Sequence, residues 1–203
     1  MKFSPRSETT RQFIIEKAAG IFNKKGYAGT SMSDLTEATR LTKGSIYGNF
    51  ENKDDVALAV FNFNAARRNK LIREKLDKAV SSKEKLMVFI NTFSQDEIQQ
   101  FPEGGCPLLN AGIEADDTHE PLRKRVAEEL VDTQQQLAAI VRHGMQFNEF
   151  SNTTDADKVA INLVALIQGG IFIARTTQNA FYLDTVLETA RKLIHEIEAK
   201  PGN

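Results

Sequence analysis

The sequence predicts an all-α protein of about nine helices, with a small N-terminal head and a larger C-terminal body. Only five prolines occur, and none interrupts a long periodic segment. No stretch shows the alternation of polar and apolar residues between turn dipeptides that is typical of sheet strands. Apolar residues instead recur at intervals of three and four, as they do on the buried stripe of a helix.

Length and composition narrow the function classes. A chain of 203 residues with 41% hydrophobic and 26% charged residues is typical of a soluble globular protein. The single cysteine, Cys106, excludes a disulfide framework and a multi-cysteine zinc site. The most apolar stretch, residues 159–174, is shorter than the ~20 residues of a membrane span, and no signal sequence is visible. We therefore expect a cytoplasmic protein that does not bind a membrane.

Charge is distributed unevenly along the chain. Residues 1–53 contain nine basic and five acidic side chains, whereas residues 54–203 contain 17 basic and 22 acidic ones. The head therefore carries a net charge of +4 and the rest of the chain −5. This asymmetry favours a head that approaches phosphates.

Three helices are expected in the head, at residues 9–25, 31–38 and 43–49. The first ends at Lys24-Lys25-Gly26, where cations and a glycine suit a helix C-terminus. Ser31 and Asp34 have the spacing of a capping box at the start of the second.

Six helices are expected in the body. Asn52 caps a long fourth helix that extends to about residue 79 and is expected to be the only long link between head and body. The segment 101–107 is the clearest loop, because it contains two glycines and two prolines. The remaining helices are expected at residues 83–100, 107–117, 121–148, 155–178 and 182–199.

Residues 27–54 have the arrangement of a helix-turn-helix, two short helices across a tight turn. In the second helix Ile46 and Phe50 lie four positions apart and are expected to face inward. Gly44 and Gly48 keep the outer surface low enough to enter a DNA groove. Two glycines destabilise so short a helix, which favours a functional reason for them.

The same region carries a longer pattern. It reads Thr42-Lys43-Gly44-Ser45-Ile46-Tyr47-x-x-Phe50-x-x-Lys53-Asp54, and Phe22-x-x-x-Gly26-Tyr27 and Thr30-Ser31 precede it. This pattern resembles the DNA-binding head of TetR-family transcriptional repressors, over about residues 10–68. The resemblance implies a DNA-binding domain at residues 1–54 and a ligand-binding and dimerisation domain at residues 55–203.

By the same resemblance, the protein is expected to be a homodimer that a small-molecule inducer releases from palindromic double-stranded operator DNA. The residues expected to contact DNA are Thr30, Ser31, Thr42, Lys43, Gly44, Ser45, Tyr47, Asn49 and Lys53. Two positions depart from the family pattern. Arg40 stands where the family usually has a glycine, so a left-handed backbone conformation is expected there. Gly48 stands where a larger side chain often reaches the groove, so fewer side chains would read the bases.

The body leaves alternatives open. One helix face either pairs with a second copy of the chain or belongs to an internal core, and it comprises Ile161, Val164, Ala165, Gln168, Gly169 and Phe172. The candidate ligand-binding residues are Phe89, Phe93, Cys106, Phe147 and Phe172. The segment that begins Gly105-Cys106-Pro107 and includes Asn110 and Glu114 resembles a subset of TetR-family bodies, without implying a ligand.

Two other functions are weighed against the regulator. Cys106 precedes Pro107 at an expected helix start behind two glycines, which suits an accessible thiol that senses electrophiles or oxidants. A buried apolar filler is the alternative. A small helical enzyme is disfavoured, because the three histidines are far apart and no catalytic or phosphate-binding motif occurs. The carboxylates around His119 fit a solvated helix end better than a metal site, and no metal or cofactor is predicted.

Overall fold

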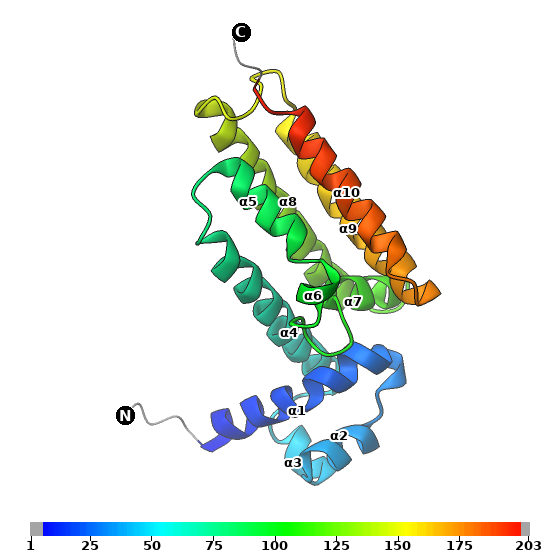
Figure 1. Cartoon of the computed structure of the whole chain (residues 1–203). Coiled ribbons are helices and arrows are strands. Elements are labelled where there is room, and N and C mark those ends of the chain that lie inside the picture. The colour runs from blue at the N-terminus through cyan, green and yellow to red at the C-terminus, as the bar shows by residue number, and fades with distance from the viewer. Residues whose placement is uncertain (1–5, 200–203) are drawn as a thin grey trace. The chain divides into compact units, whose positions relative to one another are not determined.

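A computed structural model of the chain describes residues 6–199. The secondary structure of these residues is helical, apart from one isolated bridge between Phe150 and Glu198, so the all-α class is confirmed (Figure 1). The helices are α1 (Arg6–Gly29), α2 (Met32–Thr39), α3 (Lys43–Tyr47), α4 (Lys53–Leu76), α5 (Ser82–Asn91), α6 (Gln95–Ile98), α7 (Pro107–Ala115), α8 (Glu120–Gln146), α9 (Ala156–Thr177) and α10 (Phe181–Glu196).

The described residues pack as two units. Those up to Asn69 form one unit with Phe101–Ala127, and Lys70–Gln100 forms the other with the residues from Glu128 onward. Helices α4 and α8 therefore each contribute residues to both units. Because α8 lies wholly within the predicted body, the expectation that α4 is the only long link between head and body stays a prediction. The functional boundary after residue 54 stays a prediction.

The core of the first unit forms where α1, α2, α3 and the start of α4 turn apolar side chains towards one another. Ile14, Leu35, Ile46 and Val56 are fully buried in this cluster. Each such side chain contributes about 1.5–3 kcal/mol when it leaves water. Helix α1 also contacts α7, so a segment far along the chain packs onto the head.

The regular part of α1 ends at Gly26, as predicted. Gly26 has φ 73° and ψ −180°, a conformation that is open almost only to glycine. A single further helical turn follows, up to Gly29. The chain therefore changes direction at Gly26, just before the helix-turn-helix begins.

In the second unit α10 packs against α9 and α5, and Figure 1 shows α9 and α10 side by side. The two helices approach closely at Gly170, where an added Cβ would lie 3.1 Å from side-chain atoms of Val186. Ile167 of α9 and Leu187 of α10 are buried. The absence of a side chain at Gly170 therefore permits this packing.

The described residues contain ten helices, one more than expected. The fifth helix was expected to continue to about residue 100, but α5 ends at Asn91. The amides of Phe93 and Ser94 bond to carbonyl oxygens three residues back rather than four, which closes the helix. The short α6 follows as a separate turn.

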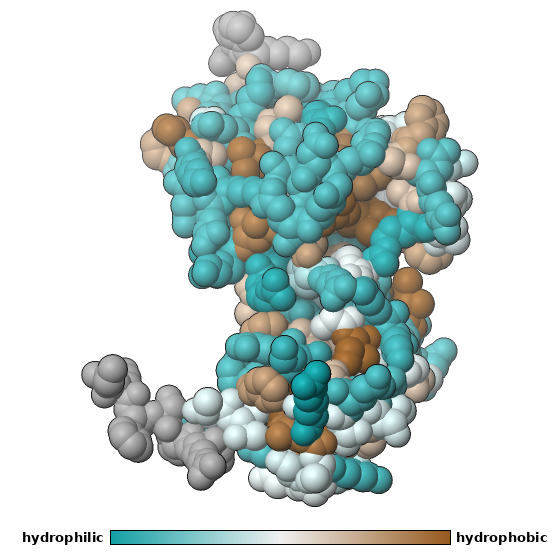
Figure 2. Space-filling view, turned by 60° about the horizontal axis from the view of Figure 1, so that its bottom comes forward, coloured by the Kyte–Doolittle hydropathy of each residue, from teal (hydrophilic) through white to brown (hydrophobic). Residues whose placement is uncertain are grey.

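Helix α9 is the one described helix that is long and apolar enough to cross a membrane, with a mean hydropathy of 1.6 in its most apolar window. With 22 residues, the helix is longer than the apolar stretch of residues 159–174 that is too short for a membrane span. The core helix of a globular protein passes the same test. On the face of the molecule in Figure 2 hydrophilic residues predominate, and hydrophobic ones occur in separate patches.

Candidate nucleic-acid interface

Helix α3 exposes a polar surface because its apolar side chains are buried on the opposite side. Ile46 and Phe50 are 0% and 3% exposed, which confirms their predicted inward orientation. Lys43, Gly44 and Tyr47 are exposed. A Cβ added to Gly44 would meet nothing within 4 Å, so this side of the helix is low and open.

Both helices of the motif begin at side-chain caps. The amide of Asp34 donates to Ser31 Oγ at 3.1 Å, and the amide of Ser31 donates to the Asp34 carboxylate at 2.8 Å, which confirms the capping box. The amide of Ser45 donates to Thr42 Oγ1 at 3.1 Å at the start of α3. The ion pair with Lys25, followed by the bonds from Ser31, holds the pKa of Asp34 well below its ordinary value.

The turn between the two helices is made by Arg40. Its backbone is left-handed, with φ 56° and ψ 24°, as predicted for this position. That conformation costs a non-glycine residue about 1–2 kcal/mol. Because the residue is exposed, Arg40 adds a cation to the surface of the motif that the family resemblance did not assign.

The residues expected to contact DNA differ in exposure. Those that are exposed are Ser31, Thr42, Lys43, Gly44 and Tyr47, and those that are partly exposed are Ser45, Asn49 and Lys53. Thr30 is fully buried, and its hydroxyl donates to the carbonyl oxygen of Gly26 at 2.6 Å. This burial corrects the expectation for Thr30, whose side chain stabilises the turn after α1 and cannot reach DNA from there.

A cluster around Tyr27 holds the first residues of α4. Lys53 Nζ lies 4.3 Å from the centre of the Tyr27 ring, and the Tyr27 hydroxyl donates to the carboxylate of Asp54. That hydrogen bond, together with burial and the charges of Asp54 and Glu114, raises the pKa of Tyr27 to about 12. Tyr27 therefore fixes Asp54 and lies directly under the neighbouring Lys53.

His119 packs against the same tyrosine. The two rings meet edge to face with their centres 4.6 Å apart, and His119 Nδ1 accepts from the amide of Leu122 at 3.1 Å. The residue is 6% exposed, so the expectation of a solvated helix end is wrong at His119. Its Nε2 lies 3.8 Å from the Asp54 carboxylate. Residues 6–199 hold no cluster of three histidine, cysteine or acidic side chains that could bind a metal ion.

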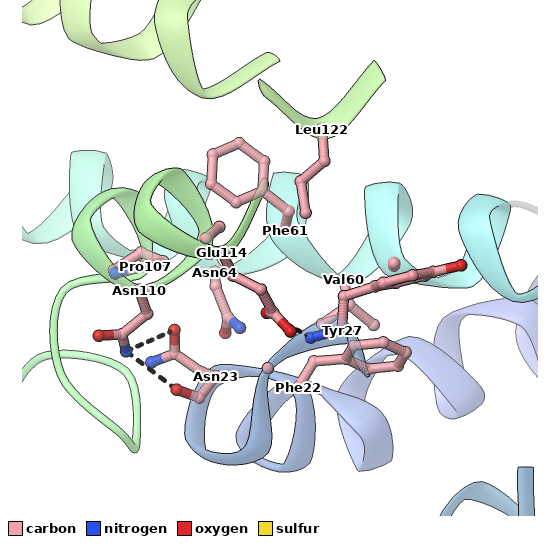
Figure 3. Close-up of a pocket in the computed structure, with 13 residues that line it drawn as sticks. Phe22, Asn23, Tyr27, Val60, Phe61, Asn64, Pro107, Asn110, Glu114 and Leu122 are labelled. Carbon is pink, nitrogen blue, oxygen red and sulfur yellow. Dashed lines mark hydrogen bonds between the residues drawn. The ribbon is translucent and has the colours of Figure 1, made fainter. Parts of the chain in front are cut away.

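The C-terminal end of α1 is held by α7, which lies far along the sequence. The carboxylate of Glu114 accepts from the amide of Tyr27 at 2.6 Å (Figure 3). It also accepts from the amide of Ala28 at 2.7 Å. These two amides directly follow the interruption at Gly26, so they begin a new helical turn and have no carbonyl partner within it. No local pattern could have indicated this contact, because 87 residues separate Tyr27 from Glu114.

Two asparagines make a second connection to the same end of α1. Asn23 Nδ2 donates to the carbonyl oxygens of Glu103 at 2.7 Å and Gly105 at 2.9 Å. Asn110 Nδ2 donates to the carbonyl oxygens of Asn23 and Gly104, both at 2.9 Å. Gly104 has φ 96°, and a Cβ there would lie 2.7 Å from the Asn23 oxygen. The loop therefore follows the helix end closely.

A small cavity of about 30 Å³ lies beside these contacts. Phe22, Val60 and Leu122 are among the apolar residues that line it, and Asn64 and Glu114 are among the polar ones (Figure 3). This volume holds one or two water molecules, whereas sites for organic ligands are many times larger. The cavity is therefore too small to be the expected inducer pocket.

The expected pocket residues of the second unit do not all face its interior. Phe89 and Phe93 are buried, and their ring centres lie 5.3 Å apart. Phe147 and Phe172 are 66% and 48% exposed, so their expected inward placement is wrong. In α9 the neighbouring Ile171 faces the core instead of Phe172.

Cys106 belongs to the first unit, at the start of α7. Pro107 takes the first position of the helix, as predicted, and Cys106 precedes it as the N-cap residue. The residue is only 1% exposed, and the carbonyl oxygen of the neighbouring Gly105 accepts from Asn23 Nδ2 of α1 at 2.9 Å. The expectation of an accessible thiol is therefore wrong, and the buried alternative is correct.

The face of α9 that was considered for dimerisation is distinct from its buried face. Ile161 and Phe172 are 50% and 48% exposed, which excludes an internal core for these two. A Cβ added to Gly169 would meet nothing within 4 Å. Exposed aromatic side chains also occur at the start of α10, at Phe181 and Tyr182.

Two family models together match most of the chain. The model described as "Bacterial regulatory proteins, tetR family" matches residues 14–60. The model described as "Tetracyclin repressor-like, C-terminal domain" matches residues 82–190. The first match contains α2 and α3, and the second contains the asparagine and glutamate of α7 that contact α1.

Known proteins resemble the chain along nearly its whole length. A TetR-family transcriptional regulator from Cytophaga hutchinsonii, of known crystal structure, is 47% identical with a TM-score of 0.95, over 98% of this chain and 100% of that one. The HTH-type transcriptional repressor DhaR from Mycobacterium sp. (strain GP1) is 24% identical over 87% of this chain and 88% of its own. The TetR-family regulator CifR, crystallised as a cysteine mutant with 26-bp double-strand operator DNA, shares the fold at 19% identity, with a TM-score of 0.75 over 97% and 98% of the two chains.

Proposed function

Because this chain belongs to the TetR family of DNA-binding transcriptional regulators, we propose that it acts as a repressor that a small-molecule inducer releases from a palindromic operator. The observation that carries the proposal is the exposed side of α3, where Lys43 and Tyr47 flank the open Gly44. A slim helix with polar reach on that side suits a major groove about 12 Å wide. The relative crystallised with double-strand operator DNA supports the same mode of binding.

Within this proposal, the cations and the polar groups of the motif have different tasks. Lys43, Lys53 and the additional Arg40 contact phosphates, which sets affinity and orientation but not sequence preference. Tyr47 and Ser45 are the candidates for base edges, together with the exposed Thr42. Asn49 already donates from Nδ2 to the Ser45 carbonyl oxygen at 2.8 Å, so it offers DNA its acceptor oxygen.

The proposal requires two copies of the chain. A recognition helix of five residues offers too small an interface for tight binding, whereas two heads related by a two-fold axis can enter successive major grooves. The exposed Ile161 and Phe172 and the open Gly169 of α9 support a second copy as the occupant of that face. We assign to this interface Ile161, Val164, Ala165, Gln168, Gly169 and Phe172.

The remaining features of the proposal concern the inducer and the chemistry. A small molecule is expected to bind in the second unit, near the buried pair Phe89 and Phe93. The proposal does not include a sensor of electrophiles or oxidants at Cys106, because this residue is buried. We propose a regulator without enzymatic activity, located in the cytoplasm where its DNA is.

The test is selection of bound sequences from a pool of random duplex DNA by the full-length protein, followed by measurement of the mass of the complex. The expected result is a palindrome whose half-sites lie about 34–36 Å apart, bound by a dimer. A monomer on a single half-site, or retention of no duplex above the unselected pool, would refute the proposal. Replacing Ile161 and Phe172 together by polar residues is expected to yield monomers with greatly weakened binding.

Phosphate contacts are tested by the salt dependence of binding. Lys43→Ala is expected to reduce the slope of log K against log salt by about 1.8, because the dimer loses two contacts that each contribute about 0.9. Lys70→Ala is the matched control, since Lys70 is an exposed cation of α4 paired with Glu74 outside the motif. Equal slopes in the two variants would refute the role of Lys43.

A further inference from the structure

We infer that Glu114 is a positioning residue for DNA binding, which α7 supplies to the helix-turn-helix from outside it. The inference rests on the proposed function. The hydrogen bonds of the polar groups at the end of α1 support it. There the non-helical conformation of Gly26 interrupts the helix, and the carbonyl oxygen of Asn23 and the amides of Tyr27 and Ala28 each bond to a side chain from another segment.

Each of these groups is satisfied by the segment Glu103–Glu114. Asn110 donates to the Asn23 carbonyl oxygen at 2.9 Å, and Glu114 accepts from both amides at 2.6 and 2.7 Å. A carboxylate that accepts two backbone amides makes charge-assisted hydrogen bonds, which are stronger than neutral ones. This segment includes the residues that resemble a subset of TetR-family bodies. It therefore fixes the end of α1, directly before the DNA-binding motif.

Glu114 influences both sides of the motif through Tyr27. Ser31, the cap of α2, lies four residues after Tyr27 along the chain, and the buried hydroxyl of Thr30 fixes the turn between them. The Tyr27 side chain bonds to Asp54 and lies under Lys53 at the start of α4. Fixing the backbone at Tyr27 therefore sets both the entry to α2 and the place of Lys53.

Space at Gly26 is reserved for this carboxylate. A Cβ at Gly26 would lie 2.3 Å from Glu114 Oε2, closer than any real contact allows. The glycine thus serves both the backbone conformation and the approach of Glu114. Helix α8 begins six residues after Glu114 and extends into the second unit, so a change in that unit can reach Glu114 along the chain.

The experiment compares full-length Glu114→Ala, Glu114→Gln and Glu103→Gln proteins. Glu103→Gln is the matched control, because Glu103 also comes from this segment and pairs with α1, through Lys24, but touches neither amide. It removes the same negative charge as Glu114→Gln, so it accounts for weaker repulsion of DNA. Glu114→Gln keeps one acceptor oxygen in the same volume and remains informative where Glu114→Ala fails to fold.

Two measurements separate the inference from the proposed function. Hydrogen exchange of the Tyr27 and Ala28 amides needs no DNA and is expected to speed up in both Glu114 variants but not in Glu103→Gln. Affinity for the selected duplex is expected to fall about tenfold in Glu114→Ala, or ~1.4 kcal/mol, with Glu114→Gln intermediate and Glu103→Gln near wild type. Affinity for an unrelated duplex of equal length is expected to be unchanged, because the cations that meet phosphates remain.

Each outcome decides the matter. Unchanged exchange of the two amides, or a Glu114→Ala protein that binds the selected duplex like Glu103→Gln, overturns the inference. A lower melting temperature with unchanged operator affinity of the folded protein would mean that Glu114 only stabilises the fold. Failure to select any duplex would instead overturn the proposed function, whatever the exchange rates show.

Discussion

Replacement of Gly26 by alanine is the most demanding test of the junction between α1 and the helix-turn-helix. The backbone there has φ 73° and ψ −180°, and a residue with a side chain pays about 1–3 kcal/mol to adopt such a conformation. The new Cβ would also lie 2.3 Å from Glu114 Oε2 and 2.7 Å from its Cδ, so the carboxylate must leave. The bond from the amide of Ala28 is exposed, so this amide can regain a bond to water, whereas the bond from the amide of Tyr27 is partly buried.

We count the loss of one charge-assisted hydrogen bond, about 1.5–3 kcal/mol, and add the backbone strain. Gly26→Ala is then expected to lower the free energy of unfolding by about 2.5–6 kcal/mol, a large part of the ~5–15 kcal/mol typical of a folded protein. Denaturant titration followed by circular dichroism measures the change. Gly29→Ala is the control, because its Cβ would meet Lys25 at an ordinary 3.4 Å, and it is expected to change stability by no more than about 1 kcal/mol. A Gly26→Ala protein as stable as Gly29→Ala would refute the reasoning.

Three further outcomes are expected. Gly44→Ala should keep or raise the melting temperature, because its Cβ enters open space. It should weaken operator binding, because DNA approaches through that space. An operator affinity equal to that of the wild type would contradict the proposed interface. The stability that the protonated Tyr27 contributes should be complete below pH ~10 and be lost as the pH rises towards 12, because folding raises the pKa of Tyr27. The free energies of unfolding of wild type and Tyr27→Phe, measured against pH, should therefore differ below that window and converge above it. Cys106 should react with a thiol reagent far more slowly in the native protein than in denaturant, and Cys106→Ala should leave operator affinity within about twofold; rapid native labelling would show that the loop opens.

Features set by neighbours in the sequence could be predicted from it. The capping box of Ser31 and Asp34 and the buried pair Ile46 and Phe50 depend on residues within four positions of one another, whereas the left-handed Arg40 was expected from the family resemblance. Local chemistry decides caps and turns, so these predictions needed no knowledge of the rest of the chain.

Features set by packing between distant segments could not be predicted. Phe89 and Phe172 both lie on helices with periodic apolar residues, and only the neighbouring helices determine that the first is buried and the second exposed. The pairing of Glu114 with the turn after α1 likewise has no local signature.

The packing of α7 onto α1 limits how regulators of this kind can be recombined. A chimera that joins this DNA-binding head to a foreign sensor at residue 54 would leave behind the residues that complete the end of α1. Its Asn23 carbonyl oxygen and its Tyr27 amide would face a segment not shaped for them. A chimera intended to keep the operator preference of this head must therefore contain residues 103–114 as well as the head. The two segments are to be exchanged together.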